Sequence, residues 1–271
     1  MMREITLGQY YQTESVLHRL DPRVKITGTL VFIISLFIAK NIPSYIIATI
    51  FMTAMIVLSK VPFSFIVRGM KAVVLILMIT VIFNLFLTPG IPFFTFAGIS
   101  ITHEGVRSAA TTAVRLTYLI VGSSLMTLTT TPNNLTDGLE KLMKPLGVLR
   151  VPVHEIAMMM SIALRFIPIL MEETDKIMKA QMSRGADFES GGLIKRAKAL
   201  IPLLVPLFVS AFRRANDLAM AMEARCYHGG EGRTKMKPLV YKKSDGIAYI
   251  ILVLYLILIF VALRYGQIIK L

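Results

Sequence analysis

Long apolar runs separated by short polar segments dominate the first half of the sequence, and one more run lies near its end. A straight helical span of a bilayer needs about 20 residues. The polar stretch "KNIPS" separates the first two runs, which are shorter than this, so we expect them to form a tight helical hairpin. The five runs predicted to span the membrane are Ile26–Ala39, Ser44–Ser59, Ala72–Leu87, Ala109–Thr131 and Gly246–Leu263.

The segment Pro132–Lys243 has a different pattern, in which apolar stretches alternate with charged residues. Its stretches Ile156–Met171 and Leu200–Phe212 are apolar enough to suggest two more spans. If both crossed the bilayer, the six lysines and arginines of the connection from Lys176 to Lys198 would lie outside, against the usual cytoplasmic bias of basic residues. Prolines also interrupt both stretches. We therefore predict long helices at the cytoplasmic surface of the membrane.

The basic residues also predict the orientation of the spans. Lysines and arginines precede the first span and occur between the second and third, whereas the connection between the third and fourth has neither. The N-terminus is therefore expected in the cytoplasm of a multi-pass protein. The predicted fold is an all-α membrane protein with about five transmembrane helices and a cytoplasmic module of long coupling helices before the last span. The predicted domains are residues 1–131, 132–243 and 244–271.

Proline and glycine mark the expected helix ends within the cytoplasmic module. Pro132, preceded by Thr131, is expected to begin its first helix, and Gly185 to end its second. Gly191-Gly192 is expected to begin the third helix and Gly229-Gly230 to end it.

Composition supports a membrane protein and narrows the chemistry. The 271 residues are 55% hydrophobic, with a mean hydropathy of +0.67, whereas a soluble domain has about 45–50% apolar residues. The net charge of +14 is expected to face anionic lipid rather than nucleic acid. The single cysteine excludes an internal disulfide.

The sequence offers few candidates for catalysis. The stretch "GGEGRT" lacks the spacing and the lysine of a phosphate-binding loop, so we do not expect this chain to hydrolyse ATP. The scattered histidines predict no metal site, and we predict no catalytic residue and no cofactor. Glu172 and Glu173 are expected to pair with the lysines Lys176 and Lys179 of the same helix.

Arg115 is the one charge well inside a predicted span. Such an arginine indicates either a functional site or a structural bond to a neighbouring polar group. We favour the structural interpretation, with Asn84 as the expected partner.

Two arginines between small residues stand out at the ends of long helical patterns: Ser183-Arg184-Gly185 and Ala224-Arg225-Cys226. They belong to a larger set of stretches that resembles one family along nearly the whole chain. That family is the transmembrane T component of energy-coupling factor transporters, the EcfT/CbiQ family of the ABC superfamily. The stretches are "LHRLDPRVKI", "ALRFIPIL", "AQMSRGA" and "RRANDLAMAMEARCYHGGEGRT".

The resemblance implies a non-catalytic scaffold in a bacterial cytoplasmic membrane. It would couple two cytoplasmic P-loop ATPases, which bind the ATP, to a small hydrophobic S component that binds a vitamin or a metal ion. In the family, two Ala-Arg-Gly-type motifs dock into grooves of the ATPases. Here Ser183 replaces the first alanine, and Cys226 replaces the second glycine, which places a turn that needs a positive φ in doubt.

The two apolar stretches of the module must be covered by lipid, by the bundle or by a partner. Methionine suits surfaces that accept more than one partner, although ordinary core filling remains an alternative. We expect the S component to rest on a platform comprising Met158, Met159, Met160, Ile162, Phe166, Leu203 and Leu207.

Three other interpretations stay open at this point. The two arginines would also suit solvated helix ends. A membrane-embedded enzyme acting on a lipid or an isoprenoid would need an acidic or histidine cluster, and none is seen in the sequence. A single-chain secondary transporter predicts repeated halves and acidic residues within the spans, and the sequence has neither.

Overall fold

The computed structural model describes residues 10–39, 41–96, 99–188, 192, 194, 198–230, 234 and 236–268. Within these residues the chain forms two compact units. The membrane unit comprises residues 8–139 and 239–271, and the coupling unit is essentially residues 140–238. The boundaries predicted from the sequence lie at 131–132 and 243–244, so the structure assigns the first eight residues of the predicted module to the membrane unit.

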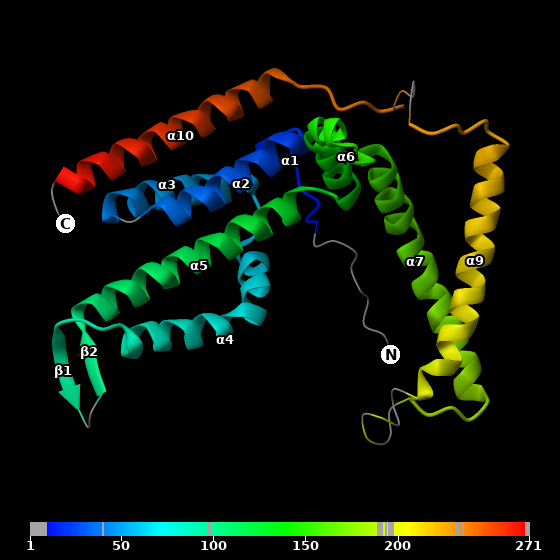
Figure 1. Ribbon diagram of the computed structural model, residues 1–271, viewed down its shortest axis with the longest axis horizontal. Coiled ribbons are helices and arrows are strands. Elements are labelled where there is room, and N and C mark those ends of the chain that lie inside the picture. Colours follow the sequence, from blue (N-terminus) through cyan, green and yellow to red (C-terminus); the bar gives the residue numbers. More distant parts are fainter. Residues whose placement is uncertain are drawn as a thin grey trace. The chain divides into compact units, whose positions relative to one another are not determined.

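The membrane unit is built from helices that correspond to the five predicted spans (Figure 1), although α2 ends one residue and α5 two residues before the predicted ends. Helices α4 and α5 begin nine and six residues before the corresponding apolar runs, because the polar residues ahead of each run continue the same helix. Asn41 precedes α3, as the predicted hairpin requires, and Pro43 occupies the first turn of α3, where its missing N–H costs nothing. The helices are α1 Val16–Arg19, α2 Pro22–Ile38, α3 Ile42–Ser59, α4 Phe63–Leu87, α5 His103–Thr129 and α10 Lys243–Ile268.

The core of this unit lies where α2, α3, α5 and α10 meet. Leu36, Ala48 and Leu128 are almost fully buried there. An aromatic stack of Phe51 on Tyr255, with ring centroids 4.3 Å apart, fills the space between α3 and α10. The Tyr255 hydroxyl is hydrogen-bonded to the hydroxyl of Ser35 at 2.7 Å, so the buried polar groups satisfy each other.

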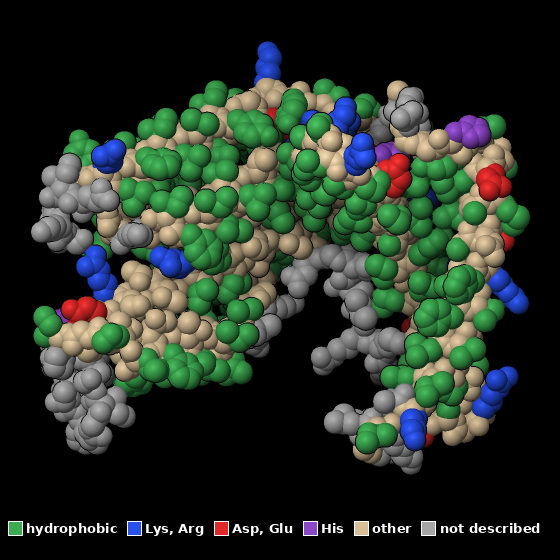
Figure 2. Space-filling view, in the orientation of Figure 1, with side chains coloured by type: hydrophobic (Ala, Val, Ile, Leu, Met, Phe, Trp, Pro, Cys, Tyr) green, Lys and Arg blue, Asp and Glu red, His purple; other side chains and the backbone are tan. Residues whose placement is uncertain are grey.

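Outward-facing side chains of the membrane unit's helices are large and apolar. Ile50, Leu87 and Ile250 are each at least 65% exposed, and Figure 2 shows hydrophobic side chains covering much of the face over α3 and α10. Such a surface is stable in lipid rather than in water. Helices α3, α5 and the Lys243–Tyr265 part of α10 are long and apolar enough to cross a membrane, which confirms an all-α membrane protein. Helix α2, at 17 residues, is shorter.

A two-stranded antiparallel sheet occupies the connection between α4 and α5, a feature that the sequence did not predict. Its strands are β1 Pro92–Phe96 and β2 Ile99–Thr102. The hydroxyl of Thr102 then accepts a hydrogen bond from the Gly105 N–H at 2.9 Å and so caps α5.

Helix α6 (Pro132–Met143) begins at Pro132 as predicted, and Gly138 packs against Pro22 and Ile26 of the membrane unit. The coupling unit follows with the 3₁₀ helix η1 (Lys144–Leu149), α7 (Val153–Ser183) and α9 (Ile201–Glu223), and α7 and α9 pack together in antiparallel directions (Figure 1). Helix α7 also meets the length and composition criteria for a span, so its placement at the membrane surface stays a prediction.

The expected end of α7 at Gly185 is confirmed, but the expected end of the third helix differs. The start expected at the glycine pair stays a prediction, because Gly191 lies outside the described residues and Ile194, Lys198 and Ala199 are already helical before α9 begins at Ile201. Helix α9 ends at Glu223, six residues before Gly229, because the chain turns out of the helix at Cys226.

Candidate functional site

The end of α7 is a compact hydrogen-bonded turn around Arg184. The Gly185 N–H donates to the Met182 carbonyl and the Ala186 N–H donates to the Gln181 carbonyl, both at 3.0 Å. Gly185 has a φ of 85°. This pair of bonds with a left-handed residue is the Schellman arrangement, which satisfies carbonyls that the helix leaves open. Arg184 is the last residue before the left-handed position and is exposed.

The end of α9 repeats this arrangement 41 residues later. The Cys226 N–H donates to the Glu223 carbonyl at 2.8 Å, and the Tyr227 N–H donates to the Met222 carbonyl at 3.0 Å. Cys226 takes the left-handed position, with a φ of 55°. The turn that the sequence left in doubt therefore forms without a glycine, and Arg225 occupies the same place in it as Arg184 does in α7.

The two arginines lie at opposite ends of the antiparallel pair. Arg184 ends α7 near the start of α9, whereas Arg225 ends α9 beside the first half of α7 (Figure 1). Nothing within the described residues forms a hydrogen bond or an ion pair with either guanidinium. Helix α9 has 23 residues, so about 35 Å separates its two ends. Each arginine is thus presented to solvent at a separate place.

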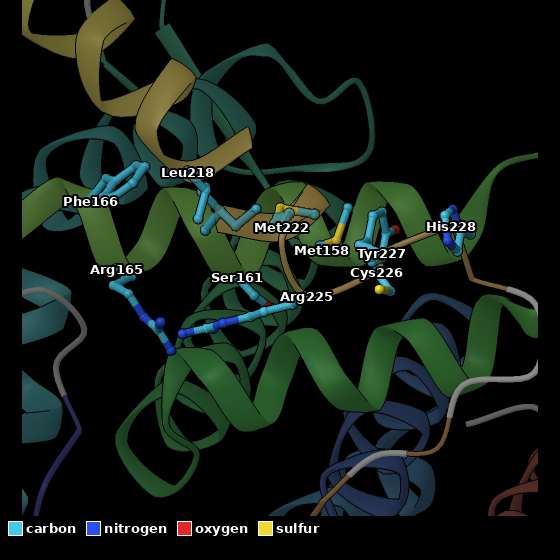
Figure 3. A pocket seen from close by; sticks show the side chains of 12 residues that line it. Met158, Ser161, Arg165, Phe166, Leu218, Met222, Arg225, Cys226, Tyr227 and His228 are labelled. Atoms are coloured by element: carbon cyan, nitrogen blue, oxygen red, sulfur yellow. The ribbon is translucent and has the colours of Figure 1, made fainter. Parts of the chain in front are cut away.

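A groove of about 660 Å³ lies between α7 and α9 at the Arg225 end (Figure 3). Three of the predicted platform residues, Met158, Ile162 and Phe166, line it from α7 at a helical spacing of four. Arg225 and Cys226, predicted for ATPase docking, line the same groove. The structure therefore brings together residues that the sequence assigned to two different partners.

The remaining platform residues lie on other surfaces. Met159 and Met160 are 58% and 42% exposed, as a partner surface requires. Leu203 is only 3% exposed and Leu207 is half-buried, so these two leucines offer little surface. Within the predicted apolar stretch Leu200–Phe212, the sequence did not single out the residues that are exposed on α9, which include Leu204, Val205, Phe208, Val209 and Phe212.

An ion pair joins α7 to α9 near their middle. The Arg214 guanidinium donates to a Glu173 carboxylate oxygen at 2.6 Å, and it also donates to the Ser210 hydroxyl at 3.4 Å. The prediction that Glu173 pairs with a lysine of its own helix is wrong, because its ion-pair partner is Arg214 of the antiparallel helix α9. The pair links the two helices across their contact.

The segment after α9 packs closely on the start of α7. A Cβ atom at Gly230 would lie 2.4 Å from Cδ2 of His154, so only glycine fits there. The His154 ring is held in place by a 3.1 Å contact between its Nδ1 and a carboxylate oxygen of Glu140. Gly230 thus serves a close approach of the backbone, and Gly229, with a φ of 100°, serves a turn, rather than the end of a helix.

Arg115 has a structural partner, as favoured, but that partner is not Asn84. Its Nη2 donates to the Tyr45 hydroxyl at 3.0 Å and to the Ala39 carbonyl at 3.4 Å, so it links α5 to the hairpin of α2 and α3. Asn84 instead accepts a hydrogen bond from the Ser108 hydroxyl at 3.2 Å.

Sequence reasoning missed a buried acidic cluster at the start of α2 and α10. Asp245, 1% exposed, accepts hydrogen bonds from the Asp21 N–H at 2.8 Å and from the Lys242 N–H at 2.7 Å. These bonds join segments that are 224 residues apart. An aspartate directly before an apolar run is the local signal of a helix cap, and it was available at position 245.

The neighbouring basic residues of "LHRLDPRVKI" complete this cluster. Arg23 donates to both carboxylate oxygens of Asp21, at 3.0 and 2.8 Å. Burial disfavours the charged form of Asp21, but the hydrogen bonds from Arg23 outweigh this, and the pKa of Asp21 lies below its ordinary value. Lys25 donates to the Thr129 carbonyl at 2.8 Å. This stretch therefore fastens the ends of α2, α5 and α10 together.

Comparison with known proteins gives consistent matches over most of the chain. The family CbiQ, described as cobalt transport protein, matches residues 13–236. An energy-coupling factor transporter transmembrane protein EcfT of Clostridium kluyveri is 54% identical over 250 residues, which cover 92% of this chain and 93% of that protein. The EcfT of Acidaminococcus fermentans is 49% identical over 267 residues, 98% of this chain and 99% of that protein. The EcfT of Bacillus subtilis is 47% identical over 261 residues, 96% and 98% of the two chains.

Proposed function

Because the chain belongs to the CbiQ family of cobalt transport proteins, we propose that it is the transmembrane scaffold of an energy-coupling factor importer. It couples ATP hydrolysis by two cytoplasmic P-loop ATPases to the movement of a small hydrophobic S component, which carries a vitamin or a metal ion. The N-terminus and the coupling unit lie on the cytoplasmic side, as the basic residues indicate. The scaffold itself is not an enzyme, and its partners bind the ATP.

The observation that carries this proposal is the equivalence of the two helix ends. Arg184 and Arg225 occupy the same position in two identical hydrogen-bonded turns. A guanidinium held at such a turn presents its planar set of donors in a fixed direction, which suits carboxylates and carbonyl groups of a partner. Two such ends about 35 Å apart match two separate subunits better than one.

The contacts between α7 and α9 suit the transmission of movement. The ion pair between Glu173 and Arg214 holds the two helices in register, so a displacement at one end shifts the pair as a body. Exposed apolar side chains lie along the same helices, among them Met159 on α7, 58% exposed, and Phe208 on α9, 62% exposed. We assign the S component to this apolar surface, which moves when the ATPases close.

Charge reversal at each helix end tests the proposal. The protein would be purified with its two ATPases and S component, and each subunit would be quantified by mass spectrometry. Arg184→Glu and Arg225→Glu should each release one ATPase, because reversal leaves the partner's groups unpaired, at a cost of about 2–5 kcal/mol. Arg213→Glu, an exposed charge on α9 away from the turn, is the matched control.

A substitution on the apolar surface tests the proposed contact with the S component. Met159→Asp should remove the S component and leave both ATPases bound, because the new carboxylate would have to be desolvated in an apolar contact. Full retention of all subunits in both arginine variants would refute the docking role. Retention of the S component in Met159→Asp would place its contact elsewhere.

A further inference from the structure

The groove at the end of α9 contains a second arginine that the proposed docking role does not use. Arg165 projects into it from α7, one helical turn beyond Ser161, and Arg225 projects into it from the end of α9. His228 also lines the groove, and its lining includes no acidic residue. The groove is therefore basic at its polar edge.

The two arginines extend toward the same point. Figure 3 shows their side chains approaching from opposite sides, with the guanidinium ends directed at one another. Within the described part of the chain, neither Arg165 nor Arg225 forms a hydrogen bond or an ion pair. Two like charges that converge repel each other unless an anion lies between them. A carboxylate or another anion placed between the two guanidinium groups would be attracted by both.

The rest of the groove is apolar. Met158, Ile162 and Phe166 form one wall on α7, and Leu218 and Met222 form the other on α9. A small inorganic ion would use the arginines and leave these walls in water. An occupant that fills the groove needs a negative group beside an apolar one, as a protein segment with an acidic residue next to an apolar side chain provides.

Among the described residues, the other docking end has no second arginine beside Arg184. The α9 residues adjoining the end of α7, Ile201–Phe212, contain no charged side chain, so α9 contributes no second cation there. The two turns have the same backbone, but within the described part of the chain it is the α9 end that places two arginines over an apolar groove. The two ends therefore fit partners with different surfaces.

We propose that Arg165 and Arg225 together bind one acidic side chain of the ATPase at the end of α9, while apolar neighbours of that acid fill the groove. This inference rests on the proposed function, because it assumes that an ATPase docks at Arg225. The inference adds Arg165 to that contact. It also requires that the ATPase present an acidic side chain flanked by apolar ones.

Neutral substitution of Arg165 in the assembled complex provides the first test. Arg165→Gln should weaken retention of the ATPase that Arg225→Glu releases by about tenfold, and the loss should be partly restored in Arg165→Lys. The ATPase that depends on Arg184 should stay bound. Arg213→Gln serves as the control for a lost exposed arginine, and thermal unfolding of each variant reports whether the coupling unit remains folded.

A crosslink identifies the occupant directly. Phe166→p-benzoylphenylalanine in the groove should crosslink, in the intact complex, to an ATPase peptide that contains Asp or Glu beside apolar residues. A crosslink to phospholipid, or to an ATPase peptide without an acid, would overturn the inference. So would equal loss of both ATPases in Arg165→Gln, or loss of neither. If Arg225→Glu itself released no ATPase, the proposed function would fail first, whatever Arg165 does.

Discussion

Removing the carboxylate of Asp245 should destabilise the membrane unit more than any single exposed charge does. Asp245 is 1% exposed and accepts the N–H groups of Asp21 and Lys242 at 2.8 and 2.7 Å. In Asp245→Ala the buried N–H of Asp21 and the part-buried N–H of Lys242 lose their acceptor. A buried donor without a partner costs about 1–3 kcal/mol and one that water can reach costs less, so we expect a loss of about 2–4 kcal/mol in the free energy of unfolding.

This loss converts to a measurable shift of the unfolding midpoint. For a chain of this size, 1 kcal/mol corresponds to about 2–4 °C, so a loss near the middle of the range lowers the midpoint by about 10 °C. Asp245→Asn keeps one carbonyl oxygen as an acceptor and should lose about half as much. The assay is fluorescence-detected size-exclusion chromatography of the detergent-solubilised protein after heating.

Asp175→Ala supplies the control, because Asp175 is exposed on α7. Its midpoint should match that of the unsubstituted protein within about 2 °C, as is usual for surface substitutions. A midpoint for Asp245→Ala as close as that would refute the reasoning. It would mean that the two donors find other partners and that the link between the starts of α2 and α10 carries little energy.

Two further predictions concern Arg115 and the two helix-end turns. Arg115→Leu and Tyr45→Phe should both lower the unfolding midpoint, Arg115→Leu by more because Arg115 also donates to the Ala39 carbonyl. The double variant should fall little below Arg115→Leu alone, because Tyr45→Phe removes a contact that Arg115→Leu has already removed. Additive losses, or a loss of transport with normal stability, would contradict a structural role. Gly185→Ala should reduce the hydrogen-exchange protection of the last turn of α7, because alanine is strained at a φ of 85°. Cys226→Gly should leave the protection of the last turn of α9 unchanged or higher. Unchanged protection in Gly185→Ala together with reduced protection in Cys226→Gly would contradict the assignment of strain to these φ angles.

The spans could be predicted because each one is a long apolar run, and in lipid a long apolar run has few alternatives to a helix. The faces of α9 could not be predicted in the same way. Its first half, "IPLLVPLFVSAF", is apolar at nearly every position, so no periodicity separates Leu203, which is buried, from Leu204, which is 49% exposed. Packing against α7 decides between them, and the sequence gives no measure of that packing.

Local sequence patterns also could not predict side-chain contacts between residues that are distant in the sequence. Asn84 was expected to bind Arg115 because it lies at a similar depth in the preceding helix, but α5 also contacts α3, and a tyrosine there offers its hydroxyl. Glu173 was expected to pair with a lysine of its own helix. Its partner is instead Arg214, which lies 41 residues away in the sequence and pairs with it across the contact between the two helices. The charge of a side chain predicts that it has a partner of opposite charge or a hydrogen-bonding partner. It does not predict which residue that partner is.

The turns at the ends of α7 and α9 show why one has glycine at its left-handed position and the other does not. Gly185 has a φ of 85°, beyond the range of about 50–70° that residues with a Cβ adopt in the left-handed region, whereas the φ of 55° at Cys226 lies inside it. The backbone bonds are the same at both ends, so the position of the arginine is set by the hydrogen bonds and not by the identity of the next residue. The departure from glycine at position 226 therefore costs the α9 end little of its geometry. What distinguishes that end is the groove beside it, where Arg165 adds a second positive charge.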